Sequence, residues 1–165
     1  MPTHEHPAVA FEAHHDHTHC VSSAMEKAQA ICKEKGLRLT AIRELVLKLI
    51  WTSHKPMVAY DLLPELAKAG FNSAPPTVYR ALDFLQEHGL VHRIARLNAY
   101  IGCQHPHNHQ HVFFLICNQC GHVQEADPTA PADLLTDYAA GLGFKAQEQT
   151  IEVLGTCPSC LASAT

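Results

Sequence analysis

The residues of this sequence best suited to chemistry are two closely spaced cysteine pairs, Cys117-x-x-Cys120 and Cys157-x-x-Cys160. A C-x-x-C turn places two sulfurs on one side of a tight loop, at a spacing that suits tetrahedral zinc. The pairs are separated by 36 residues, more than in a compact zinc ribbon. We therefore predict a structural Zn²⁺ site with four thiolate ligands, which joins two distant stretches of the chain.

Histidine and cysteine are both frequent, with 14 and 7 residues in a chain of 165. Imidazole and thiolate are the best protein ligands for zinc, so the composition favours metal binding. A secreted disulfide framework is disfavoured, because the number of cysteines is odd and the chain begins without the features of an export signal. Redox motifs are also disfavoured, because neither pair lies in a thioredoxin-like pattern. We expect reduced thiols in a cytoplasmic protein without a membrane span.

A second set of possible ligands is separate from these four cysteines. It combines imidazole, thiol and carboxylate groups, a mixture that zinc accepts readily. Four of its histidines alternate along one stretch. In a strand such alternation points all four to one face, so only one or two can reach the same ion. The set consists of His92, Cys103, His105, His107, His109, His111 and Glu125.

The net charge of −4 conceals three regions of different composition. Residues 1–21 carry three acids and neither Lys nor Arg, and six of the first 20 residues are histidines. Residues 22–98 carry eleven Lys and Arg against seven acids, and residues 99–165 carry one Lys against six acids. We interpret these as a disordered histidine-rich tail, a winged-helix DNA-binding domain, and a dimerisation and metal-binding domain.

The middle region predicts four helices followed by a small hairpin. Capping residues, glycine stops and apolar residues at helical spacing mark the helices. Pro75-Pro76 opens the fourth helix at little cost, because the N–H that proline lacks has no partner in the first helical turn. Helices and hairpin in this order are typical of a winged helix-turn-helix. The expected elements are helices from Ser23 to Gly36, from Thr40 through Ile50, over 60–69 and over 77–88, then extended runs at 90–94 and 99–102.

The fourth helix is the expected recognition helix. Its apolar residues form one stripe, and Thr77, Tyr79 and Arg80 lie off that stripe near the N-terminal end. That end of a recognition helix reaches base edges and phosphates in the major groove. A surface ion pair of Arg80 with Asp83 or Glu87 is the alternative, and we favour the contact with DNA.

Several of these stretches, taken in order, resemble the ferric uptake regulator superfamily and, within it, the zinc uptake regulator branch. The resemblance covers roughly residues 23–161. The motifs that carry it are AYDLL (59–63), Pro75-Pro76, TVYRALDFL (77–85), GLVH (89–92), YIGC ending at Cys103, and Cys117-x-x-Cys120-Gly121 followed by Glu125.

The resemblance implies an α+β protein, with an N-terminal winged helix-turn-helix and a small C-terminal α/β dimerisation domain. It implies a zinc-responsive transcriptional repressor that binds operator DNA as a zinc-loaded homodimer and controls zinc-uptake genes. It adds Tyr60 to the DNA-contacting residues, and it implies about two Zn²⁺ per subunit, one structural and one regulatory. The ligands carried over are Cys117, Cys120, Cys157 and Cys160 for the structural zinc, and His92, Cys103, His111 and Glu125 for the sensory zinc.

The sequence departs from the family pattern in two places. The stretch from Cys103 to Cys117 is about one residue shorter, so His109 competes with His111 as the ligand. The His-His-Asp-His cluster of iron-sensing members is replaced by Gln110-His-Val-Phe-Phe. This replacement weakens the case for an iron- or peroxide-sensing function. It also leaves a third metal site without support.

Other functions define the alternatives. Sensing of iron, manganese or nickel is the closest one, and a histidine-rich zinc-buffering protein without a DNA-binding role is another. A zinc hydrolase or deaminase needs an open coordination position beside a glutamate, as in H-x-E with P-C-x-x-C. The sequence contains neither H-x-E nor H-E-x-x-H. We therefore expect no enzymatic activity.

Overall fold

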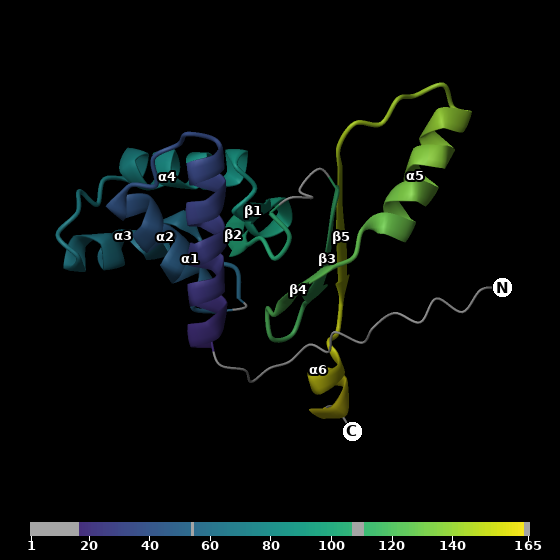
Figure 1. The fold of residues 1–165 in the computed structure, drawn as a ribbon. Coiled ribbons are helices and arrows are strands. Elements are labelled where there is room, and N and C mark those ends of the chain that lie inside the picture. The colour runs from purple at the N-terminus through teal and green to yellow at the C-terminus, as the bar shows by residue number, and fades with distance from the viewer. Residues whose placement is uncertain (1–16, 54, 107–110, 164–165) are drawn as a thin grey trace.

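The structure, a computed structural model, describes residues 17–53, 55–106 and 111–163. Figure 1 shows the helices α1 to α4 on one side, a two-stranded wing beside them, and a three-stranded sheet with the helix α5 on the other side. This mixed architecture confirms the expected α+β class. Among the described helices, none is both long and apolar enough to cross a membrane.

Four helices pack around one apolar core. Val46, Leu62 and Leu82, from three of these helices, are completely buried in it. Burial of such a side chain stabilises a fold by about 1.5–3 kcal/mol, so this core holds the helices in fixed relative positions. The helices are α1 (His17–Glu34), α2 (Ala41–Trp51), α3 (Ala59–Lys68) and α4 (Pro75–Glu87).

Helix α1 is longer than its local capping signal indicates. The sequence predicts a start at Ser23, but the helix begins at His17. Val21 already packs on the helical core next to Met25, so burial of an apolar stripe extends the helix beyond the cap signal. The last five residues of the predicted tail are therefore helical. The rest of the tail, residues 1–16, lies outside the described residues.

The wing is an antiparallel hairpin of β1 (Val91–Ile94) and β2 (Ala99–Gly102), connected by the 3-10 turn η1 (Ala95–Leu97). Asn98 closes the turn in the left-handed conformation, with a φ of 47°. Arg93 donates a hydrogen bond to its side-chain oxygen at 2.7 Å. The sequence predicts a domain boundary after residue 98. Because β2 pairs with β1, the wing hairpin extends past that boundary to Gly102.

The second sheet has the strand order β4-β3-β5. Strand β4 is antiparallel and β5 is parallel to the central strand β3. The parallel connection requires a crossover, which includes the helix α5. The elements are β3 (His111–Cys117), β4 (Val123–Ala126), α5 (Thr129–Gly141), β5 (Gln149–Gly155) and α6 (Pro158–Ser163).

The wing packs directly on this sheet. Ile94 and Ile101 of the wing form one buried cluster with Phe114, Ile116 and Val123 of the sheet. The cluster is separate from the helical core, and Phe114 within it is completely buried. Separating the wing from the sheet would expose this apolar surface to water, so burial favours the docked arrangement.

Candidate metal centres and nucleic-acid interface

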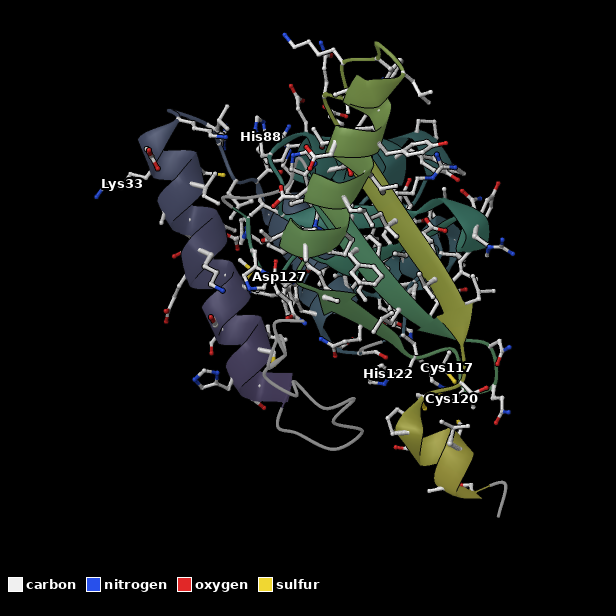
Figure 2. All side chains as sticks on the ribbon, turned by 90° about the vertical axis from the view of Figure 1, so that its right-hand side faces the viewer. Lys33, His88, Cys117, Cys120, His122 and Asp127 are labelled. Atoms are coloured by element: carbon white, nitrogen blue, oxygen red, sulfur yellow. The ribbon has the colours of Figure 1, made fainter. Side chains whose placement is uncertain are left out.

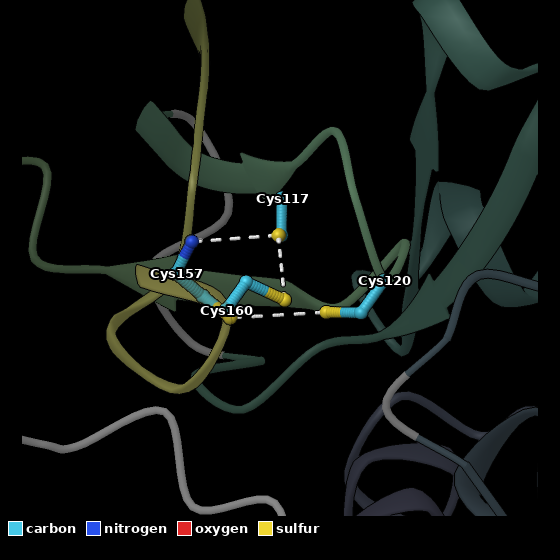
Figure 3. A group of neighbouring side chains, drawn as sticks. All are labelled: Cys117, Cys120, Cys157 and Cys160. Atoms are coloured by element: carbon cyan, nitrogen blue, oxygen red, sulfur yellow. Dashed lines mark hydrogen bonds between the residues drawn. The ribbon is translucent and has the colours of Figure 1, made fainter. Parts of the chain in front are cut away.

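Four cysteine sulfurs meet beyond the end of the second sheet (Figure 3). Their Sγ atoms lie within 4.8 Å of one another, and the separations are 3.9 Å from Cys117 to Cys160 and 3.8 Å from Cys120 to Cys157. A tetrahedral ion with zinc–sulfur bonds of about 2.3 Å has its sulfurs about 3.8 Å apart, so the four cysteines fit a closed zinc site. Figure 2 shows Cys117 and Cys120 at the end of the strands, next to α6.

Backbone geometry and hydrogen bonds shape the thiol chemistry of this cluster. After Cys117 the chain turns back through Gly121, which has a φ of 73° and donates its N–H to the Cys117 carbonyl. The backbone N–H groups of Cys120 and Cys157 lower the pKa of Cys117 to about 6. The hydrogen bond with the Cys157 sulfur raises the pKa of Cys160 to about 12. Without a cation, part of the cluster therefore stays protonated at neutral pH, whereas a divalent ion stabilises four thiolates together.

A second group of donors lies at the junction between the wing and the sheet. His92 belongs to β1, Cys103 directly follows β2, and Glu125 belongs to β4. Their donor atoms lie within 4.8 Å of one another. The exposed fraction is 8% for His92, 2% for Cys103 and 7% for the Glu125 side chain. The fold therefore brings three of the four predicted sensory ligands together in a buried place, with a donor set that suits zinc.

Neighbouring groups orient these donors. The backbone N–H of Gln104 donates to Oε2 of Glu125 at 2.9 Å, and Oε1 lies 3.8 Å from Nε2 of His92. The Phe114 ring packs edge-on against the His92 imidazole, with ring centroids 5.5 Å apart. Burial raises the pKa of Cys103 to about 12, and the Glu125 carboxylate contributes to this rise. The thiol is therefore protonated at neutral pH, and a metal ion must displace its proton.

The fourth predicted sensory ligand, His111, is not part of this compact group. It is the first residue of β3, and its Nδ1 is buried without a hydrogen-bond partner among the described residues. Of the four alternating histidines, His111 alone lies in a described strand, because His105 precedes the strand in a loop. His107 and the competing candidate His109 lie outside the described residues.

His105 belongs to the second set of possible ligands that the sequence indicates, but it is not one of the four predicted sensory ligands. Its Nδ1 lies 3.6 Å from Oε1 of Glu125, and its side chain is 70% exposed. The signals in the sequence are its place in the run of alternating histidines and its position two residues after Cys103. His105 therefore places an exposed imidazole next to the buried donors.

The predicted DNA-contacting residues lie on α3 and α4. Tyr60 is 65% exposed at the start of α3, and Tyr79 is 37% exposed in the first turns of α4. Arg80 is exposed and Thr77 is half-buried beside them. Within the described ranges, no ion pair joins Arg80 to an acidic neighbour on α4. This arrangement disfavours the surface ion pair that the sequence leaves open.

The fold and its donor clusters define a class of protein. It is a winged helix-turn-helix protein whose wing docks on a sheet, with a group of possible metal ligands at the junction. The chain belongs to the ferric uptake regulator family, whose family model matches residues 34–154. It is similar to the zinc uptake regulation protein of Escherichia coli K12, with 38% identity over 83% of this chain and 81% of that protein. The resemblance that the sequence motifs indicate is therefore confirmed.

Solved structures agree with this assignment. A zinc uptake regulator complexed with zinc and DNA matches with a TM-score of 0.81 and 36% identity, over 87% of this chain and 97% of that chain. Holo XcZur matches with a TM-score of 0.77 and 43% identity, over 86% of this chain and 99% of that chain. Apo XcZur gives a TM-score of 0.50 at 43% identity, over 86% and 97%. This chain therefore superimposes better on the holo form of XcZur than on its apo form.

Proposed function

We propose that this chain is a zinc-responsive transcriptional repressor, which binds operator DNA as a zinc-loaded homodimer and controls zinc-uptake genes. The observation that carries the proposal is the buried group of His92, Cys103 and Glu125 at the junction of wing and sheet. The similarity to a zinc uptake regulation protein, and to a regulator solved with zinc and DNA, supports it.

The proposed regulation follows from where the donors come from. His92 moves with the wing, whereas Glu125 moves with the sheet. A zinc ion held by His92, Cys103 and Glu125, with His111 as the proposed fourth ligand, supplies a cross-link between the two parts. The donors converge in the docked arrangement, so zinc binding favours that arrangement, and by linkage operator DNA strengthens zinc binding. The better superposition on holo than on apo XcZur supports this coupling.

A second zinc per subunit would have a structural role. Its proposed ligands hold together the end of β3 and the start of α6, and the four sulfurs leave no open coordination position for a substrate. This makes two zinc ions in each subunit, one structural and one regulatory. The structural ligands are Cys117, Cys120, Cys157 and Cys160.

Helix α4 is the proposed recognition helix. Thr77, Tyr79 and Arg80 would contact the operator from its N-terminal end, with Tyr60 of α3 beside them. The surrounding region carries the positive charge of the chain, which a polyanion requires. A two-fold dimer would present two copies of α4 to a pseudo-palindromic operator.

The proposed dimer interface lies on α5 and β5. Leu134, Tyr138 and Leu142 of α5 and its end are 71%, 70% and 72% exposed. On β5, Val153 and Leu154 are also exposed, at 45% and 41%. Large apolar side chains left exposed along one helix, at positions four residues apart, mark an interaction site. Strand β5 lies at the edge of the described sheet, where a further strand can pair with it.

We also propose a cytoplasmic location. The five cysteines of the two donor groups are thiols and not disulfides in the structure, and both groups need reduced sulfur to bind metal. The ferric uptake regulator family consists of transcription regulators, so the activity expected of the chain is regulation rather than catalysis.

A gel shift with the promoter region of the chain's own gene, under buffered free metal, tests the proposed function. We expect zinc to promote binding, and we expect protein purified without added metal to retain zinc in its thiolate site. Stronger activation by iron, manganese or nickel at matched free concentrations would reassign the metal. Zinc binding without any operator binding would instead indicate a zinc-buffering protein.

A further inference from the structure

Glu125, Phe114 and Glu152 form one row across the second sheet. In the strand register, Phe114 of β3 pairs with Glu125 of β4 on one side and with Glu152 of β5 on the other. Directly paired residues of neighbouring strands point to the same face of a sheet. Phe114 and Glu125 both contact His92 of the wing, so this face is the one on which the wing docks.

Glu152 reaches the wing at the opposite end of this row from Glu125. Its Oε1 accepts a hydrogen bond of 2.9 Å from the backbone N–H of Ala95, a residue 57 positions away in the chain. Ala95 opens the turn η1, directly after the strand that carries His92. The wing therefore contacts the sheet through polar groups at two ends, with the buried ring of Phe114 between them.

We propose that Glu152 is a positioning residue that clamps the wing onto the sheet and thereby sets the zinc affinity of the sensory site. The inference rests on the proposed function, because it assumes that zinc binds at the wing–sheet junction. The apolar cluster holds the wing on the sheet, and the polar contacts at both ends of the row fix its angle, which keeps His92 within reach of Glu125. Any contact that favours the docked arrangement strengthens the binding of a ligand that requires this arrangement.

The acceptor side of the clamp is tested in the full-length protein with its thiolate-site zinc in place. Zinc affinity is measured by chelator competition without DNA. Glu152→Ala removes the acceptor and should weaken zinc binding about threefold to tenfold, as expected for a partly exposed hydrogen bond to a charged group. Glu152→Gln keeps an acceptor oxygen and should retain most of the affinity. Glu148→Ala removes an exposed acid just before β5 and should leave the affinity unchanged.

Ala95→Pro tests the same contact from the donor side. Proline has no N–H, and it fits the first position of a helical turn when the preceding residue is extended. Ile94 has this extended conformation, with φ −84° and ψ 104°. The substitution should weaken zinc binding as much as Glu152→Ala does. The double variant should be no weaker than either single variant, because both remove one hydrogen bond.

Three results would overturn the clamp: unchanged zinc affinity in Glu152→Ala, an equal loss in Glu152→Gln, or additive losses in the double variant. Dissociation of the Glu152→Ala dimer, or loss of its thiolate-site zinc, would also overturn it, because the carboxylate would then act on the sheet itself.

The wild-type protein separates the two proposals. If wild type shows no zinc-stimulated operator binding, the proposed function fails, whereas a responsive wild type with unaffected variants contradicts the clamp alone.

Discussion

Nε2 of His92 lies 3.8 Å from Oε1 of Glu125, although the two residues belong to different sheets. His92 is part of the wing, and Glu125 is part of the three-stranded sheet. Both side chains are buried, and the wing must stay docked for them to remain neighbours. Under the proposed function, this pair is the link between metal binding and the orientation of the winged helix.

Replacing Cys103 by serine should abolish zinc-stimulated operator binding and leave a folded dimer. Serine is close in size, but a hydroxyl group does not replace a thiolate as a zinc ligand at neutral pH. Gel shifts under buffered zinc measure the response, and sedimentation measures the dimer. Cys20→Ser removes a half-buried thiol of α1 and serves as the control that keeps the response. An undiminished zinc response in Cys103→Ser would show that the sensory assignment is wrong.

Replacing Cys117 by serine should instead unfold the C-terminal part. The binding free energy of a structural zinc is about 10–16 kcal/mol in small zinc domains and acts as folding free energy. Hydrogen exchange should show lost protection in β3 and β5, while the helical core around Val46 stays protected. The variant should also contain at least one zinc fewer per subunit, because the proposed sensory ligands Glu125 and His111 lie in the same sheet. Unchanged protection together with a full metal content would contradict the structural role.

Zinc binding at the sensory site should strengthen with rising pH. Burial raises the pKa of Cys103 to about 12, so the thiol is protonated in the zinc-free protein throughout the physiological range. Binding requires the thiolate and releases that proton, so the affinity should rise about tenfold per pH unit between about pH 7 and about pH 8.5. Chelator competition, corrected for the chelator's own protonation, measures the slope. An affinity independent of pH would contradict proton release from Cys103.

Disrupting the apolar surface of α5 should separate the dimer. Tyr138→Asp places a charge in the proposed interface, where its burial is costly. Sedimentation at micromolar concentration should show monomers, and operator affinity should fall because one recognition helix is lost from each complex. Asp137→Asn changes an exposed neighbour on the same helix and should leave the dimer intact. A Tyr138→Asp variant that remains dimeric would place the interface elsewhere.

Local signals in the sequence predict the elements that depend on local interactions. Pro75-Pro76 places the start of α4 within two residues, because proline is compatible with a first helical turn and not with a later one. The C-x-x-C spacing brings Cys117 and Cys120 into one turn through local chain geometry alone. The start of α1 is different, because packing of Val21 on the helical core decides it and a local cap signal does not.

Long-range strand pairing could not be predicted in this way. The parallel register of β3 with β5 places Glu152 beside Phe114. The two residues are far apart in the chain, so no local sequence pattern predicts that they are neighbours. The same holds for His105, whose proximity to Glu125 depends on how the loop after Cys103 folds over β4. The sequence therefore indicates which residue types bind metal, and the sheet register determines which of them meet.

Replacing Arg80 by alanine should weaken operator binding at saturating zinc. Arg80 is exposed in the first turns of α4 and has no ion pair with another described residue, so its charge is available to DNA. A base contact contributes about 1–3 kcal/mol, which corresponds to a loss of about fivefold to 150-fold. If Arg80 contacts a phosphate instead, its loss should weaken binding equally on every DNA sequence. It should also reduce the slope of log affinity against log salt concentration by about one. Lys145→Ala removes the same charge from the other part of the chain and serves as the control. If Arg80→Ala binds the operator as strongly as this control, Arg80 is not part of the DNA interface.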